Sequence, residues 1–287
     1  MLSGVPLFLC LDTSNKTQDC FRISAKETQC FSVGLKILPW SIVHLPIHYL
    51  CPVQLFYVPH IQPNATFTLP PDEVRHCLKV LRKRVGDTVH VTDGLGHLYL
   101  AELIADRLDD CQLKVVSAIA DETARAYKVT IALAPTHDAD RLEWFIEKAT
   151  ELGIDAIQLV ITSRTERFKY KPERLQKILL GALKQSGRAT LPVLDEPQDW
   201  KAFMKSSSQY TGKKLIAACF GERKSLKDLY QSGQDVLVLI GPEGDFTLEE
   251  VNMAVQSGFQ PVTLGAARLR VETAALATLQ TIHVLNG

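Results

Sequence analysis

Val236-Leu237-Val238-Leu239-Ile240-Gly241-Pro242-Glu243-Gly244 is the stretch of sequence that decides the fold. Its first five residues form a short apolar run rich in β-branched side chains, which is typical of a strand buried on both faces. A glycine turn follows, and Thr247 and Glu250 then have the spacing of a capping box, in which both side chains satisfy backbone N–H groups at a helix start. The stretch therefore predicts a strand, a loop and a helix, in that order.

A second glycine loop repeats this order nearer the C-terminus. Residues 261–264 predict a strand, 265–270 a loop, and 272–285 an Ala/Leu-rich helix. Because glycine lets backbone groups approach a ligand closely, two such loops can close on one ligand. Strand-loop-helix units with glycine occur throughout α/β proteins. The pair, with two arginines and a glutamate in the second loop, favours a binding site.

Short apolar runs alternate with helical patterns from residue 128 onward. Gly153 and Pro172 are suited to end one helix and to begin the next. This alternation predicts a mainly parallel sheet covered on both faces. The sequence contains no G-x-G-x-x-G after the first of these strands and no G-x-x-x-x-G-K-[ST], so dinucleotide and triphosphate sites lack their signatures. The predicted strands are 129–134, 154–161 and 215–219, and the predicted helices are 140–152 and 172–186.

Residues 54–123 differ, because short β-type runs are separated there by turn residues, which predicts a small β-barrel or sandwich. A short helix is predicted at 72–81. It ends in a basic cluster, with Arg75 and His76 nearby, that can bind phosphates. Cations at the C-terminal end of a helix are also stabilised by its dipole, so a purely structural role is an open alternative. The basic cluster consists of Lys79, Arg82, Lys83 and Arg84.

Composition is that of a folded protein of roughly two domains, with 287 residues of which 46% are apolar. Thirty-two basic and 32 acidic residues balance, so binding of nucleic acid depends on local patches. The seven cysteines form no C-x-x-C pair and are interpreted as reduced thiols. No apolar stretch has the length of a membrane span, and a secretory n-region is absent from the sequence, so a cytoplasmic location is expected.

Residues 1–53 form an atypical N-terminal segment, with four of the cysteines and no sustained helix or strand period. We hypothesise that residues 1–52 are an upstream extension of the reading frame and that Val53 corresponds to a GTG start codon. Mass spectrometry of the native protein tests this, because a peptide from within residues 1–52 would contradict it.

The two glycine loops resemble the signature of the bacterial 16S ribosomal RNA uracil-N3 methyltransferases, a family of the trefoil-knotted SPOUT class. The resemblance covers residue 54 to the C-terminus, and its motifs stand in the family's order. They are Asp140-Arg141-Leu142-Glu143, Lys148-Ala149-Thr150-Glu151-Leu152-Gly153, Thr165-Glu166-Arg167, Lys184-Gln185-Ser186-Gly187-Arg188, Ile240-Gly241-Pro242-Glu243-Gly244, and Leu264-Gly265 with Arg268-Leu269-Arg270-Val271-Glu272-Thr273-Ala274.

The resemblance implies a PUA-like RNA-binding domain at 54–123, a SPOUT methyltransferase domain at 124–287, S-adenosylmethionine as cofactor, no metal, and a homodimer acting on 16S ribosomal RNA in the small ribosomal subunit. The final helix is apolar enough for a subunit contact, although packing within one chain is equally open. The cofactor residues implied are Gly241, Pro242, Glu243, Gly244, Leu264, Gly265, Leu269 and Thr273. The RNA-binding residues implied are His76, Lys79, Arg82, Lys83, Arg84, Arg141 and Arg188.

Arg270 and Glu272 are the catalytic candidates, because arginine N–H groups suit the uracil anion that forms when N3 loses its proton. Arg268 and Arg141 are alternatives for that role, and Glu272 can equally cap its helix or pair with an arginine. Asp245 replaces a glycine common in the family, and we expect it to change the local charge and to restrict positive φ.

The sequence leaves two other functions open. A SPOUT enzyme that methylates a ribose 2′-hydroxyl would share the cofactor loops, and an assembly factor that has lost catalysis would share the fold.

Overall fold

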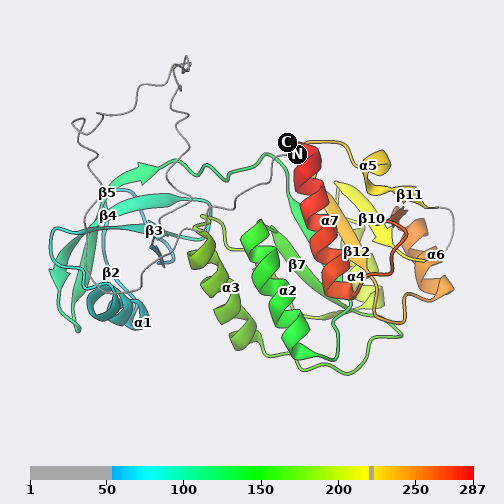
Figure 1. The fold of residues 1–287 in the computed structure, drawn as a ribbon, viewed down its shortest axis with the longest axis horizontal. Helices are drawn as coiled ribbons and strands as arrows, with labels where there is room; N and C mark the ends of the chain where they lie inside the picture. The colour runs from blue at the N-terminus through cyan, green and yellow to red at the C-terminus, as the bar shows by residue number, and fades with distance from the viewer. Residues whose placement is uncertain (1–53, 220–222) are drawn as a thin grey trace, which may run out of the picture. The chain divides into compact units, whose positions relative to one another are not determined.

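The structure is a computed structural model that describes residues 54–219 and 223–287 (Figure 1). The hypotheses about residues 1–53 and Val53 therefore lie outside the described residues. In the described part of the chain, no helix combines the length and the apolar character needed to cross a bilayer.

A five-stranded mixed sheet forms the first domain. Its strand order is β1-β3-β4-β5-β2, with β1 parallel to β3 and the other pairs antiparallel. Leu103 and Leu113 are fully buried on the inner face, and along β4 and β5 buried and exposed residues largely alternate as expected for a sheet with one wet face. The strands are β1 Leu55–Tyr57, β2 Thr66–Thr68, β3 Thr88–Thr92, β4 Leu98–Asp106 and β5 Cys111–Ile119.

The helix predicted at 72–81 is present, but its second half is a π-helix. Helix α1 (Pro71–Arg75) continues into η2 (His76–Val80), in which the N–H of Leu81 donates to the carbonyl of His76, five residues back. Arg82 has φ 55° and ends the helix. The wider turn directs Cys77 and Leu78 into the core while Lys79 stays exposed.

An eight-stranded sheet forms the second domain, and every strand pair in it is parallel, as the alternating sequence pattern predicted. The order is β11-β13-β10-β12-β6-β7-β8, with β9 paired to β7. The strands are β6 Val129–Leu133, β7 Ala156–Ile161, β8 Val193–Leu194, β9 Gln198–Asp199, β10 Lys213–Ala217, β11 Lys224–Ser225, β12 Val236–Ile240 and β13 Gln260–Thr263.

Helices cover both faces of this sheet, and Figure 1 shows α2, α3 and α7 side by side on one of them. Strand β12 illustrates the reason. Val236, Val238 and Ile240 pack in the core with α2 and α7, whereas Leu237 and Leu239 pack in the core with α4 and α6. The helices are α2 Ala139–Leu152, α3 Pro172–Ser186, α4 Trp200–Ser207, α5 Leu226–Leu229, α6 Leu248–Gln256 and α7 Val271–Asn286.

Local capping signals fix the helix ends as predicted. Gly153 ends α2 in the left-handed region with φ 87°, and Pro172 begins α3. The Thr247 hydroxyl accepts from the Glu250 N–H at 3.2 Å, and the Glu250 carboxylate accepts from the Thr247 N–H at 2.8 Å. Helix α4 was not predicted, although Asp199 caps it by accepting from the N–H of Ala202 at 3.0 Å.

The segment after α3 docks on the turn at residues 93–96. The Thr92 hydroxyl donates to the carbonyl of Ala189 at 2.8 Å, and the Leu191 N–H donates to the carbonyl of Gly94 at 2.8 Å. Gly94 has φ 76°, and a Cβ there would lie 3.2 Å from Cβ of Leu191 in the segment after α3, and 2.9 Å from the Tyr57 ring. Close approach of the two segments therefore requires glycine at this position.

Candidate functional site

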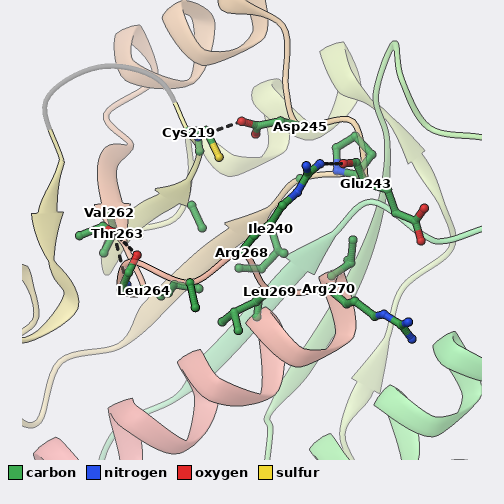
Figure 2. A pocket seen from close by; sticks show the side chains of 18 of the residues that line it. Cys219, Ile240, Glu243, Asp245, Val262, Thr263, Leu264, Arg268, Leu269 and Arg270 are labelled. Atoms are coloured by element: carbon green, nitrogen blue, oxygen red, sulfur yellow. Dashed lines mark hydrogen bonds between the residues drawn. The ribbon is translucent and has the colours of Figure 1, made fainter.

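Three loops meet at the carboxyl edge of the parallel sheet. Strand β10 lies between β12 and β13, so Ala218 and Cys219, which directly follow β10, lie between the two predicted glycine loops. Together they enclose a cavity of about 560 Å³, within the usual range for small-molecule sites (Figure 2). The neighbouring C-terminal ends of parallel strands thus form one cavity, and both predicted glycine loops line it.

Most of the predicted cofactor residues line this cavity. They are Gly241, Pro242, Glu243, Leu264, Gly265 and Leu269. Gly244 and Thr273 belong to the same segments but do not line it. Ile240, Val262 and Ala274 add apolar surface to its wall, so the cavity joins an apolar side to the backbone and charged groups of the loops.

Gly241 has a structural role that the sequence did not reveal. A Cβ at Gly241 would lie 2.8 Å from Cε2 of Phe246, a ring that is fully buried. The loop then turns, with the Asp245 N–H donating to the carbonyl of Pro242 at 2.9 Å. Gly241 is therefore needed for packing of the loop on Phe246, in addition to any approach of a ligand.

The prediction that Asp245 would restrict positive φ is wrong, because Asp245 adopts φ 61°. Aspartate tolerates the left-handed region better than most residues since its short side chain hydrogen-bonds to nearby backbone groups. Here Oδ1 accepts from the N–H of Phe246 at 2.8 Å. The loop therefore keeps a conformation that a glycine could also adopt.

Three arginines from three different segments brace the first glycine loop. Arg141, on α2, donates from Nη1 to Oε1 of Glu243 at 2.7 Å. Arg268, from the second glycine loop, donates to the carbonyl of Glu243 at 3.2 Å, and Arg164, which follows β7, donates to the carbonyl of Gly244 at 2.7 Å. Charged donors on loop carbonyls hold the cavity wall in one arrangement.

The two catalytic candidates differ in environment. Arg270 lines the cavity, is exposed, and points in a different direction from Arg268 (Figure 2). Glu272 lies in the first turn of α7, is only 7% exposed, and its Oε2 has no hydrogen-bond partner among the described residues. In the same part of the chain, Glu272 forms neither an ion pair with an arginine nor a side-chain cap of α7. The carboxylate is therefore buried with an unused acceptor, and Glu272 does not line the cavity, although its neighbours Arg270 and Val271 do.

The residues predicted to bind RNA fall into three places. The basic cluster lies on and after η2, where Arg82 and Arg84 are exposed and Arg84 approaches Asp106 at 3.8 Å. Arg141 lines the cavity instead.

Arg188 is half-buried, where its Nε donates to the carbonyl of Glu151 at 2.9 Å and its guanidinium covers Gly153. Burial, and next the positive charge of Arg125, lower the pKa of Arg188. These contacts tie the end of α3 to the end of α2.

Sequence reasoning missed several residues of the cavity. Cys219 and Arg223 line it from the segment after β10, and Ala267 lines it from the second glycine loop. Their position depends on β10 being inserted between β12 and β13, which no local pattern indicates. Asp245 also lines the cavity, and the sequence signal that could have indicated this was the aspartate at a position where the family commonly has glycine.

Groups of three or more His, Cys, Asp or Glu side chains that could hold a metal ion are absent from the described residues.

Family profiles match both domains. One described as an RNA methyltransferase domain matches residues 123–283, and one described as an RNA methyltransferase PUA domain matches residues 69–116. The predicted fold class is therefore confirmed: a PUA-type β domain is followed by an α/β domain of SPOUT type.

Several known proteins are similar over most of the chain. The Synechocystis sp. protein named Ribosomal RNA small subunit methyltransferase E is 31% identical over 260 residues, which is 85% of this chain and 84% of that protein. The protein of the same name from Bacillus subtilis is 28% identical over 236 residues, which is 77% of this chain and 91% of that protein.

Two crystal structures are similar in fold. A probable rRNA-methyltransferase from Porphyromonas gingivalis is 38% identical with a TM-score of 0.74, and the match covers 81% of this chain and 98% of that one. A Ribosomal RNA small subunit methyltransferase E from Neisseria gonorrhoeae, bound to S-adenosyl methionine, is 29% identical with a TM-score of 0.71, at 81% and 98% coverage.

Proposed function

Because this chain belongs to the ribosomal RNA small subunit methyltransferase E family, we propose that it transfers a methyl group from S-adenosylmethionine to N3 of a uracil in 16S ribosomal RNA. The observation that supports this best is the cavity formed by the two glycine loops, in a fold whose relative from Neisseria gonorrhoeae binds S-adenosyl methionine. The substrate is the small ribosomal subunit or its RNA, and the reaction takes place in the cytoplasm, where subunits are assembled.

The residues of the cavity fit this cofactor. Leu264 and Leu269 offer apolar surface to a purine ring, and the loop backbone around Gly241 and Gly265 offers N–H and C=O groups to its polar edge. Pro242 and Glu243 complete that wall, whereas Gly244 and Thr273 are exposed neighbours of lining residues and do not line the cavity themselves. S-adenosylmethionine supplies an electrophilic methyl group on a positively charged sulfonium.

Arg270 is the catalytic residue of the proposal. Uracil N3 must lose its proton before it can accept a methyl group, and the anion that results is spread over N3 and the two flanking carbonyl oxygens. The exposed guanidinium at the cavity mouth presents N–H donors that stabilise this anion. We assign Glu272 a supporting role, in which its unpaired oxygen accepts from a donor of the substrate or of the neighbouring loop.

The basic cluster supplies the RNA-binding surface. Lys79, Arg82 and Arg84 are exposed, and phosphate contacts from such side chains position an RNA without reading its sequence. His76 and Lys83 flank this surface. The target base must be unstacked or single-stranded to reach the cavity. Arg188 is left out of this surface, because its guanidinium is engaged between α2 and α3.

We also propose the domain limits 54–123 and 124–287, and a homodimer that uses α2 and α7. These two helices pack together and carry exposed apolar side chains, among them Trp144 at 47% and Val284 at 67% exposure. Large apolar side chains that remain exposed on adjacent helices favour a subunit contact. Light scattering of the wild type and of Val284→Lys tests this, with a dimer expected for the first and a larger monomer fraction for the second.

Methyl transfer to purified small subunits that lack the modification tests the function. Labelled S-adenosylmethionine is supplied and the product nucleoside is identified by mass spectrometry. We expect N3-methyluridine, a rate that falls at least tenfold in Arg270→Ala, and an unchanged rate in Lys201→Ala, which removes an exposed charge on α4. A ribose 2′-O-methyl product would contradict N3 methylation and would show that the chain catalyses the alternative SPOUT reaction. Absence of cofactor binding would favour a silent assembly factor.

A further inference from the structure

Asp245 connects two of the three loops around the cavity. One carboxylate oxygen, Oδ1, accepts from the N–H of Phe246 within its own loop, and the other, Oδ2, accepts from the N–H of Cys219 at 2.9 Å. Figure 2 shows this second bond between Asp245 and Cys219 at one end of the cavity. The Asp245 side chain thus joins the segment that follows β12 to the residue Cys219, which follows β10.

The Cys219 side chain takes part in the same contact. The interaction of its thiol with the Asp245 carboxylate, with burial second, raises the pKa of Cys219. A thiol held in its neutral form keeps the negative charge of the pair on the carboxylate. The charge at this end of the cavity therefore belongs to Asp245.

The other charges of the cavity leave that carboxylate available. The lining residues include four arginines and two carboxylates. Glu243 is committed to Arg141, with 2.7 Å between Oε1 and Nη1. Within residues 54–219 and 223–287, Asp245 forms no ion pair with a lysine, arginine or histidine. Both of its oxygens accept backbone hydrogen bonds, but its negative charge has no ion-pair partner among the described residues and can act on a positively charged ligand.

We propose that Asp245 is a specificity-determining residue that makes the cavity prefer the positively charged methyl donor over the uncharged sulfide product. The inference rests on the proposed function, since it concerns the same cavity. S-adenosylmethionine and S-adenosylhomocysteine differ by one methyl group and one positive charge, so contacts with the adenosine and amino-acid parts cannot separate them. With the ligand bound, the half-exposed carboxylate of Asp245 in the cavity lining would separate them by charge, which corresponds to about threefold to tenfold in affinity.

Calorimetric titration of the full chain with the two ligands tests this. The measured quantity is the ratio of the product's Kd to the donor's Kd. In Asp245→Asn, which keeps the size of the side chain and removes its charge, we expect the ratio to fall by about threefold to tenfold. Sinefungin carries an ammonium group near the position of the sulfonium, so its affinity should weaken together with that of the donor.

Asp245→Gly is the second variant, because glycine accepts φ 61° without strain. It removes the charge and the bond to Cys219 together. The same fall in the ratio is expected, accompanied by faster alkylation of the Cys219 thiol by iodoacetamide, an uncharged reagent. Glu249→Gln is the matched control, since it removes an exposed carboxylate on the following helix that does not line the cavity, and its ratio should equal that of the wild type.

The outcomes separate the inference from the function on which it rests. A ratio that stays within twofold of the wild type in both Asp245 variants would overturn the inference and leave the proposed function intact. Equal weakening of both ligands would also overturn it, because Asp245 would then only support the loop. A wild-type chain that binds neither ligand would overturn the proposed function, and the inference with it.

Discussion

Replacing Gly241 by alanine tests the packing of the first glycine loop most directly. The added Cβ would lie 2.8 Å from Cε2 and 3.0 Å from Cδ2 of Phe246, closer than carbon atoms pack. Phe246 is fully buried, and its ring centroid lies 5.6 Å from that of Trp200, so the ring cannot move away freely. Overpacking of this kind costs about 1–3 kcal/mol of the free energy of unfolding.

The effect should be visible in both stability and binding. For a chain of this size, 1 kcal/mol shifts the melting temperature by about 2–4 °C, so we expect Gly241→Ala to melt about 2–12 °C lower. Since the loop forms one wall of the cavity, the Kd for S-adenosylmethionine should rise as well. Thermal unfolding followed by circular dichroism, and calorimetric titration, measure the two changes.

Two comparisons make this prediction specific. Gly181→Ala on α3 meets no atom within 4 Å, so it should raise the free energy of unfolding by about 0.5–1 kcal/mol. In the background of Phe246→Leu, Gly241→Ala should cost less than it does alone, with a coupling of about 0.5–3 kcal/mol. If the two changes are additive, or if Gly241→Ala melts at the wild-type temperature, contact with Phe246 is not the reason for glycine at this position.

Three further predictions concern a carboxylate, a histidine and the basic cluster. Glu272→Gln removes the charge of a carboxylate whose Oε2 is buried without a partner in the described residues. We expect kcat to fall about tenfold or more while the melting temperature stays at that of the wild type. A lower melting temperature with normal kcat would indicate a structural role. Burial lowers the pKa of His283 from 6.5 to about 4, so between these pH values the unfolded chain binds a proton that the folded chain does not. The free energy of unfolding should therefore fall by about 1–2 kcal/mol from pH 7 to pH 4, after discounting for solvent screening, and by less in His283→Asn, as measured by urea titration. Arg82→Ala should make the negative slope of the logarithm of the RNA association constant against log salt shallower by about 0.7. Lys201→Ala should leave that slope unchanged.

Much of the fold follows from short-range patterns. Residues 236–240 form the predicted strand because a run of β-branched and leucine side chains can be apolar on both faces of a covered sheet. Gly153, Pro172 and the pair Thr247/Glu250 mark helix ends through backbone hydrogen bonds within a few residues. The π-helix at 76–80 was missed, because an apolar period over two turns does not distinguish it from an α-helix.

The sequence by itself determined strands β6, β7, β10, β12 and β13 to within two residues, the ends of α2 and α3, the two glycine loops and, through its motifs, the family, because each depends on neighbouring residues in the chain. Only the tertiary structure placed β10 between β12 and β13, which brings Cys219 to the cavity and to Asp245. It alone also placed the Arg188 guanidinium over Gly153 and set Phe246 against Gly241. The physical reason is that strand order and side-chain packing join segments that are far apart in the chain. The contacts that stabilise one strand order and one packing arrangement are formed between these segments, so no local sequence pattern reveals them.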